Sequence, residues 1–260
     1  LIRNLGVMSQ RGLFSDNSVT DAVVSHLTNQ SILNSARVHP VTLLVAKMTY
    51  GAGKGLKGSL TWDVNKKICD ALEEAFYLAF GNIKGSGKRI LHSVDCSGSM
   101  QSATCGIERL TACQAVATLV MEAVRREHKY HIETECKYIQ DVVLFNHQST
   151  MVNIKPTDKL DAVMKLIQDR NFGSTDCSQP MLKAMETFKS SGGKMGCYDA
   201  FIVYTDNETN TGRVHPSEAL EQYRQLTGID AKFVVVATTP TDNTIACPLF
   251  SKSSRSEERR

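Results

Sequence analysis

The sequence lacks three features that would place it quickly in a class of proteins. It has no run of eighteen apolar residues, so we expect no membrane-spanning helix. No signal peptide and no initiator methionine precede Leu1, so we expect a fragment of a longer chain. The eight cysteines include no Cys-x-x-Cys pair, and several fall inside predicted helices or strands. That usage favours reduced thiols in a cytoplasmic protein over a disulfide framework.

A strong excess of charge of one sign is also missing, because the net charge of the 260 residues is only +3. The charge is nevertheless unevenly divided. Residues 1–89 hold eleven Lys and Arg against six Asp and Glu, a balance of +5, whereas residues 90–260 have a balance of −2. A basic front part can simply be solvated, or it can attract phosphate groups.

The front of the chain has helical periodicity throughout. Ser18 to Asp21 resembles a capping box that opens a helix, and Pro40 suits the first position of another. We expect Asp63 to cap a further helix with an apolar face from Val64 onwards. Consecutive helices joined by short turns predict helical-repeat packing.

A glycine-rich stretch, residues 51–58, lies between the last two of these helices. Its glycines at 53, 55 and 58 match the dinucleotide-binding spacing, but that motif must follow a strand and this stretch follows a helical pattern. Residues 81–89 also contain Gly-Lys, but they lack the phosphate-loop spacing and precede a strand. We therefore expect no nucleotide site in either stretch, and we interpret residues 81–89 as a linker.

Four basic side chains of the front part are candidates for contact with the phosphate groups of a ligand. Lys54 and Lys57 are in the glycine-rich stretch, where the absence of bulky side chains allows a phosphate backbone to approach closely. Arg37 and Lys47 are on neighbouring elements and could extend the same face if the helices pack as repeats. The alternative is a solvated connection with no ligand.

The back part alternates short apolar strands with helical patterns, which predicts an open α/β sheet. Residues 90–94 form a strand that runs into Asp95, with Ser97 and Ser99 directly after it. One carboxylate and two hydroxyls are hard oxygen ligands of the kind that Mg²⁺ prefers. An ordinary capped helix start explains the same residues equally well.

Two later loops favour the cation. Thr175 and Asp176 are in a turn before a helical pattern, and Asp206 follows a second buried strand at residues 200–204. This constellation resembles the metal-ion-dependent adhesion site of von Willebrand factor A domains. The resemblance implies that Ser97, Ser99 and Thr175 coordinate a divalent cation directly, and that Asp95 and Asp206 do so directly or through water. Asp176 is expected to cap the helix and to donate or accept a hydrogen bond into the site.

Two other chemistries are weaker interpretations. His128, His131 and Cys136 could suggest zinc, but no second ligand pair accompanies them, so a solvated helix end and loop is favoured. A nucleophilic Ser97 or Ser99 would need a positioned base, and His92 is inside the strand. We therefore expect no enzyme activity.

Several further stretches extend the resemblance to nearly the whole chain, from Leu1 to about Pro248. They include Arg37–Pro40, Gly55–Gly58, Gly173–Ser178 and Phe201–Thr209. These stretches resemble the Ro autoantigen family, whose proteins join a ring of helical repeats, the TROVE domain, to a von Willebrand factor A domain. The family implies binding of small noncoding RNAs, such as Y RNAs or defective transcripts. Cys247 and the charged tail after it depart from the family pattern.

The resulting expectation is an α/β, Rossmann-like von Willebrand factor A domain at residues 85–250. It follows the last helices of a TROVE-like RNA-binding domain at residues 1–84 and precedes a disordered tail at 251–260. The expected function is that of a ribonucleoprotein component with a divalent cation, Mg²⁺, in its A domain. The alternative is a protein-interaction module in which the cation binds a partner's carboxylate without RNA.

Overall fold

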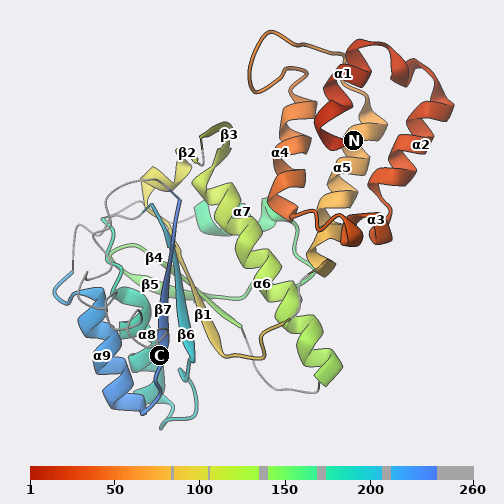
Figure 1. Cartoon of the computed structure of the whole chain (residues 1–260). Coiled ribbons are helices and arrows are strands. Elements are labelled where there is room, and N and C mark those ends of the chain that lie inside the picture. Colours follow the sequence, from red (N-terminus) through yellow and green to blue (C-terminus); the bar gives the residue numbers. More distant parts are fainter. Residues whose placement is uncertain (83–84, 105, 135–139, 169–173, 207–211, 239–260) are drawn as a thin grey trace, which may run out of the picture. The chain divides into compact units, whose positions relative to one another are not determined.

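The computed structural model describes residues 1–82, 85–104, 106–134, 140–168, 174–206 and 212–238 (Figure 1). The chain forms two compact units. The first unit comprises Leu1–Gly85 together with Gly106–Thr111, and the second comprises Ser86–Cys105 and the chain from Ala112 onwards. Each unit is described by itself below. The predicted tail at 251–260 lies outside the described residues.

The first unit is helical, as its periodicity predicts. Its α-helices are α1 (Leu5–Gln10), α2 (Asn17–Leu27), α3 (Gln30–Ser35), α4 (Pro40–Gly51) and α5 (Lys66–Leu78). Short 3-10 helices occupy Ile2–Asn4, Leu13–Ser15 and Ala79–Asn82. Helix α5 packs against both α4 and α2, and these contacts bury Leu27, Leu43, Ile68 and Leu72 almost completely.

Two of the predicted helix starts are wrong. Helix α2 is capped by Asp16, whose carboxylate accepts the Ser18 N–H at 2.8 Å, so Ser18 is the second residue of the helix. Helix α5 is capped by Asn65 and not by Asp63. In both cases a neighbouring Asp or Asn fulfils the same chemical requirement, an oxygen that accepts an otherwise unpaired N–H. The predicted placement of Pro40 at the first position of α4 is confirmed, with His39 as its cap.

The second unit contains a five-stranded sheet in the order β5-β4-β1-β6-β7. The strands are β1 (Ile90–Asp95), β4 (Asp141–Phe145), β5 (Ser149–Val152), β6 (Ala200–Thr205) and β7 (Lys232–Ala237). Strand β1 runs parallel to β4 and β6, and β7 parallel to β6, whereas β5 returns antiparallel to β4. All six residues of the central strand β1 are buried.

Helices cover both faces of this sheet. Figure 1 shows α6 (Ala112–Thr134) and α7 (Leu160–Gln168) on one side, and α8 (Gln179–Ser190) and α9 (Pro216–Thr227) on the other. Helices α8 and α9 contribute Met181 and Tyr223 to a core shared with Leu91 and Phe201 of the sheet. The predicted alternation of strands and helices is thereby confirmed.

Three short strands have no counterpart in the sequence prediction. Strand β5 contains no buried residue, and β2 (Ala103–Thr104) and β3 (Ile107–Thr111) lie between β1 and α6 in the sequence. None of the three has the continuous apolar run on which the other strands were recognised. No helix in the described part of the chain is both long enough and apolar enough to cross a membrane.

Candidate cation site and nucleic-acid interface

The loop after β1 is organised by the buried carboxylate of Asp95. Its Oδ1 accepts the N–H of Ser97 at 2.8 Å, which turns the chain away from the strand direction. The hydroxyls of Ser97 and Ser99 then lie 3.0 Å apart. Asp95 and Ser97 are buried, whereas Ser99 is exposed. The loop therefore presents two adjacent hydroxyl oxygens beside a desolvated carboxylate, with one of them reaching solvent.

Strand β6 brings a second carboxylate to this loop. The register pairs Val94 with Tyr204, so the next residues, Asp95 and Thr205, end the two strands side by side. Thr205 donates its hydroxyl proton to Asp95 Oδ2 at 2.7 Å, and its hydroxyl oxygen also lies 3.4 Å from Asp206 Oδ1. Asp95 and Asp206 thus share Thr205 as a neighbour at this edge of the sheet.

Thr205 is a residue of the site that the sequence prediction did not identify. It is fully buried and contacts both carboxylates. Its position immediately before Asp206 was visible, but its contact with Asp95 depends on the register between β1 and β6. Sequence patterns do not give that register.

The electrostatics of the site favour a cation or a proton. Burial raises the pKa of Asp95 to about 6, against hydrogen bonds from the Ser97 N–H and the Thr205 hydroxyl that lower it. The negative charge of Asp206 raises the pKa of Asp95 further. A positive charge placed between two buried carboxylates that repel each other stabilises their ionised forms.

Thr175 is buried at the same edge of the sheet. Its neighbour Asp176 donates its backbone N–H to the carbonyl of Asn146 at 3.0 Å. Cys96, in the loop after β1, donates its N–H to the carbonyl of Phe145 at 2.9 Å. Both loops are therefore anchored on consecutive residues at the end of β4, which brings Thr175 to the edge that carries Asp95.

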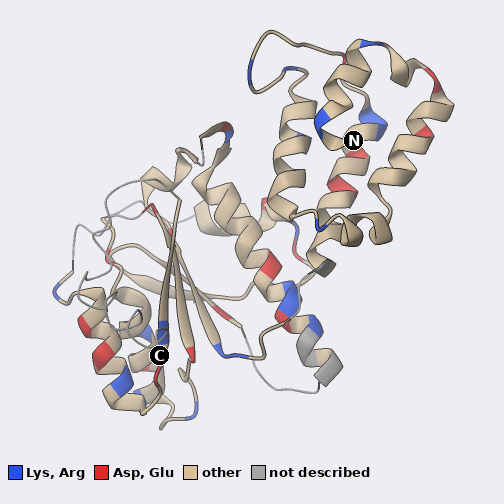
Figure 2. Ribbon diagram, viewed as in Figure 1, with Lys and Arg blue, Asp and Glu red and all other residues tan. Residues whose placement is uncertain are grey.

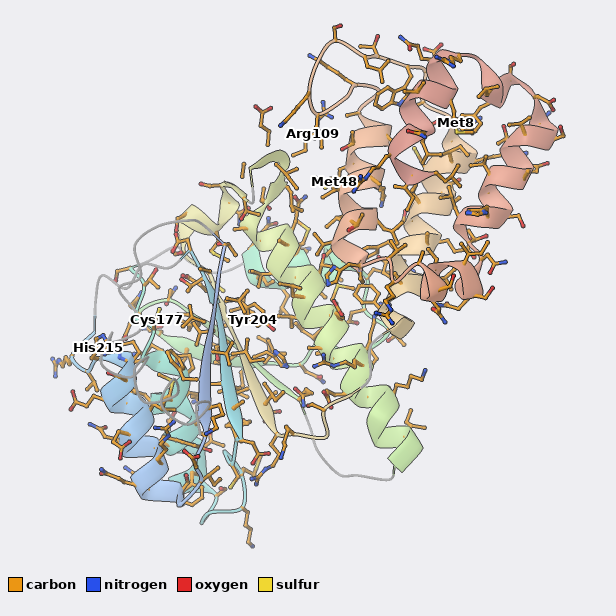
Figure 3. The ribbon with its side chains drawn as sticks, viewed as in Figure 1. Met8, Met48, Arg109, Cys177, Tyr204 and His215 are labelled. Carbon is orange, nitrogen blue, oxygen red and sulfur yellow. The ribbon has the colours of Figure 1, made fainter. Side chains whose placement is uncertain are left out.

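The prediction that Asp176 caps the helix is wrong, because the N-cap of α8 is Ser178, and Asp176 instead holds the turn that precedes it. Its Oδ1 accepts from the N–H and hydroxyl of Ser178, and its Oδ2 accepts from Gln179 Nε2 at 2.8 Å. Cys177, labelled in Figure 3, packs beneath this turn against Phe145 and Val203. Asp176 thus fixes the start of α8, and its carboxylate oxygens are both engaged in doing so.

The donor set is made of hydroxyls as much as of carboxylates. Among the described residues no group of three or more His, Cys, Asp and Glu side chains is placed to hold a metal ion. The alternative zinc ligands do not change this, because His128 is exposed on α6, and the side chain of His131 and all of Cys136 lie outside the description. An oxygen set of two carboxylates and three hydroxyls suits a hard cation such as Mg²⁺ better than zinc.

His92 is buried in β1 and is engaged away from the loop hydroxyls. Its Nδ1 lies 3.0 Å from the Tyr204 hydroxyl and its Nε2 lies 2.8 Å from Gln140 Oε1. Because the amide oxygen can only accept, Nε2 carries the proton and Nδ1 accepts from tyrosine. Burial lowers the pKa of His92 to about 4. The residue is a neutral member of the core and not a general base for Ser97.

The basic candidates of the first unit fall into two groups. Lys54 and Lys57 are exposed in the loop between α4 and α5, where Figure 2 shows blue segments. Neither lysine forms an ion pair with any residue that the structure describes. The loop is an ordered one, since Gly55 N–H bonds to Leu60 O and Trp62 N–H bonds to Gly53 O, each at 2.9 Å.

Arg37 and Lys47 do not join these lysines in one cluster. Lys47 pairs with Glu73 across α4 and α5 at 3.1 Å, so its charge is already matched. Arg37 is exposed beyond the end of α3, at a left-handed φ of 48°. The twelve residues of α4 separate Arg37 from Lys54, a distance of about 18 Å along the helix. Lys54 and Lys57 are therefore the pair that the structure brings together.

The described cysteines are free thiols. They are Cys69, Cys96, Cys113, Cys177 and Cys197, of which Cys96, Cys113 and Cys177 are buried. The remaining three, at positions 105, 136 and 247, lie outside the described residues. Burial raises the pKa of Cys113 to about 11, which keeps its thiol protonated and unreactive.

Family models match the two parts of the chain separately. Residues 1–88 match the TROVE domain and residues 89–250 match the Ro60 vWA domain. The chain is 38% identical over 256 residues to the RNA-binding protein RO60 of Deinococcus radiodurans and 39% identical over 249 residues to the RNA-binding protein RO60 of Caenorhabditis elegans. Each match covers 95% of this chain but only 44% and 36%, respectively, of the relative.

A solved structure shows the same arrangement of chain. The crystal structure of the Deinococcus radiodurans RO (RSR) protein matches with a TM-score of 0.81 and 37% identity, over 95% of this chain and 47% of that one. The chain thus spans less than half the length of the relatives it matches. The chain belongs to the Ro60 family, in which a TROVE domain is followed by a von Willebrand factor A domain.

Proposed function

We propose that this chain binds small noncoding RNA as a ribonucleoprotein component, with the RNA contact in the first unit. The family supports RNA binding, because the relatives at 38% and 39% identity are named RNA-binding proteins and residues 1–88 match the TROVE domain. The observation that carries the placement is the loop between α4 and α5. It presents Lys54 and Lys57 to solvent without an ion-pair partner among the described residues.

A salt series of RNA-binding measurements tests this placement. The affinity of the 260-residue chain for a labelled single-stranded RNA should fall with salt, and the double variant Lys54→Glu, Lys57→Glu should bind more weakly to many sequences alike. Each lost phosphate contact on a single strand lowers the slope of log affinity against log salt by about 0.7, so the double variant should flatten it by about 1.4.

The matched control reverses two other lysines of the same unit. Lys66 and Lys67 are already paired with Asp70 at 2.6 Å and with Asp21 at 2.9 Å. Lys66→Glu with Lys67→Glu changes the net charge by the same amount as the test variant. It should leave the salt slope nearly unchanged. If both double variants lower affinity equally, only the net charge matters and the proposed loop contact is wrong.

We propose further that the second unit binds Mg²⁺ through Asp95, Ser97, Ser99, Thr175 and Asp206. The fit is supported by the all-oxygen donor set and by the burial of both carboxylates, which, with a smaller contribution from the charge of Asp206, raises the pKa of Asp95. The cation would supply positive charge that stabilises the two carboxylates and an open coordination position. The chain's own residues hold the loops in place through the Thr205 and Cys96 hydrogen bonds.

Thermal unfolding with and without Mg²⁺ tests the cation site. Millimolar Mg²⁺ should raise the melting temperature, and Ser97→Ala or Thr175→Ala should remove most of that rise, because a bound ligand stabilises only the folded state. Lys183→Glu, at a half-buried position of α8, is the control and should keep the rise. An unchanged melting temperature of the wild type in Mg²⁺ would leave only the capping interpretation of these residues.

A second candidate function is a protein-interaction module. Ser99 is the exposed member of the site, so a partner's carboxylate could approach a cation there from solvent. This function needs the cation and no RNA. Binding of RNA that is unaffected by Ser99→Ala, together with partner binding that is lost in the same variant, would assign the two functions to separate units. The free thiols support a cytoplasmic setting for either function.

A further inference from the structure

A pocket of about 490 Å³ opens on the first unit beside the glycine-rich loop. Its volume is within the range of about 300–1,000 Å³ that is typical of sites for small molecules. The lining is mostly apolar and comes from α1, α4 and the loop. Its principal residues are Val7, Val41, Val45, Ala46, Leu56 and Trp62.

Helix α4 explains why the pocket is apolar. One side of this helix buries Leu43 and Leu44 in the core. Its other side carries Val41, Val45 and Ala46, which are only partly buried and line the pocket. An ordinary surface helix would place polar residues there. Apolar side chains on both sides indicate that something apolar or aromatic covers the second side.

The aromatic wall of the pocket is held firmly. Trp62 donates its indole N–H to the Tyr50 carbonyl at 3.0 Å, and the two rings stack with centroids 6.0 Å apart. Gly6 lets the indole ring approach α1, because a Cβ at that position would come within 2.6 Å of the ring. Trp62 is therefore a fixed platform and not a side chain free to close the pocket.

Basic residues flank the loop side of the pocket. Gly55 and Leu56 line it, and they are flanked directly in sequence by Lys54 and Lys57. Arg3 also lines the pocket, and the lining contains no Asp or Glu. Thr49, another lining residue, has a hydroxyl without a hydrogen-bond partner among the described residues. An occupant should thus combine an apolar or aromatic part with negative charge beside it.

We propose that the pocket receives an unpaired nucleobase of single-stranded RNA whose flanking phosphates contact Lys54 and Lys57. The inference rests on the proposed RNA binding of the first unit and adds to it a site for a base. A nucleobase supplies a flat face that can stack on Trp62 and pack against the apolar side of α4. The adjoining phosphates supply the charge that matches the lysines. Such stacking accepts any base, because every base has a π-face.

The single tryptophan of the chain makes the test specific, since emission at its wavelength comes from Trp62 alone. The probes are a ten-nucleotide oligouridylate and an abasic ribose-phosphate chain of the same length and charge. The oligouridylate should bind more tightly than the abasic chain by about 5- to 150-fold, the range for stacking of one base. It should also change the emission of Trp62, whereas the abasic chain should not.

A pocket-filling variant extends the test. Ala46→Phe fills the pocket without changing charge, and it should reduce the preference for the base-bearing probe to about twofold or less while binding of the abasic chain is kept. Ala22→Phe makes the same change on an exposed position of α2 and should behave as the wild type. Circular dichroism of both variants checks folding, and the wild-type comparison of the two probes needs no variant.

The outcomes separate this inference from the proposed function. Binding of both probes with equal affinity and constant Trp62 emission would overturn the base pocket and leave RNA binding through phosphates intact. Binding of neither probe would overturn both. If sedimentation shows a dimer that Ala46→Phe dissociates, the pocket is covered by a second copy of the chain and the nucleobase assignment is wrong.

Discussion

Removal of one hydroxyl from the end of β6 should destabilise the second unit. Thr205→Val keeps the size and branching of the side chain, so no cavity forms in this fully buried position. It deletes the hydrogen bond of 2.7 Å to Asp95 Oδ2. A hydrogen bond to a charged group contributes about 1.5–3 kcal/mol, and loss of this donor leaves one carboxylate oxygen of Asp95 without it.

Urea unfolding followed by far-UV circular dichroism measures this effect. The free energy of unfolding of Thr205→Val at pH 7 should fall by about 2 kcal/mol, and that of Thr205→Ser, which keeps the hydroxyl, should fall by clearly less. The native emission of Trp62 should stay unchanged, since that residue belongs to the first unit. Equal stability of the valine and serine variants would refute the view that Thr205 stabilises Asp95 by hydrogen bonding.

Three further predictions concern the second unit and the thiols. Burial lowers the pKa of His92 to about 4, below its unfolded value near 6.5, so folding stability should be lost as pH falls through this window, by at most about 3 kcal/mol. His92→Gln should lack that part of the pH dependence in urea unfolding at pH 7 and pH 4.5. The carboxylate of Glu127, a residue only 3% exposed, accepts the N–H and hydroxyl of Ser86 and the N–H of Gly87. Glu127→Gln should weaken these hydrogen bonds to the segment before β1 and so speed proteolysis after Lys88. Mass spectrometry after alkylation in denaturant should find eight free thiols, and reproducible disulfides in native material would contradict a reducing compartment.

Sequence patterns predicted the large elements because those depend on local periodicity. The strands at residues 90–94 and 200–204 and the helix that begins at Pro40 are where the sequence patterns place them. Helix starts were less predictable, because several Ser, Asp and Asn residues compete to cap the same first turn. Asp16 and Asn65 are the caps because they have an extended backbone and accept an N–H of the first turn, and sequence patterns do not give those backbone angles.

The candidate cation site was predictable where its residues share one turn or follow parallel strands that end at the same edge of the sheet. Asp95, Ser97 and Ser99 are close because they share one turn, and Asp206 joins them because parallel strands end at one edge. The contact of Thr205 with Asp95 depends on strand register, and the pairing of Lys47 with Glu73 depends on helix packing. The pocket beside Trp62 is lined by residues from four separate stretches of the sequence, so no sequence motif predicts it.

Photocrosslinking of RNA to the whole 260-residue chain tests the central claim most directly. A single-stranded RNA carrying 4-thiouridine would be crosslinked at moderate salt, and the modified peptides would be identified by mass spectrometry. The account predicts crosslinks within the loop between α4 and α5, concentrated around Leu56 and Trp62, and their loss in the variant Lys54→Glu, Lys57→Glu. Crosslinks found only in the second unit, or unchanged in that variant, would contradict it.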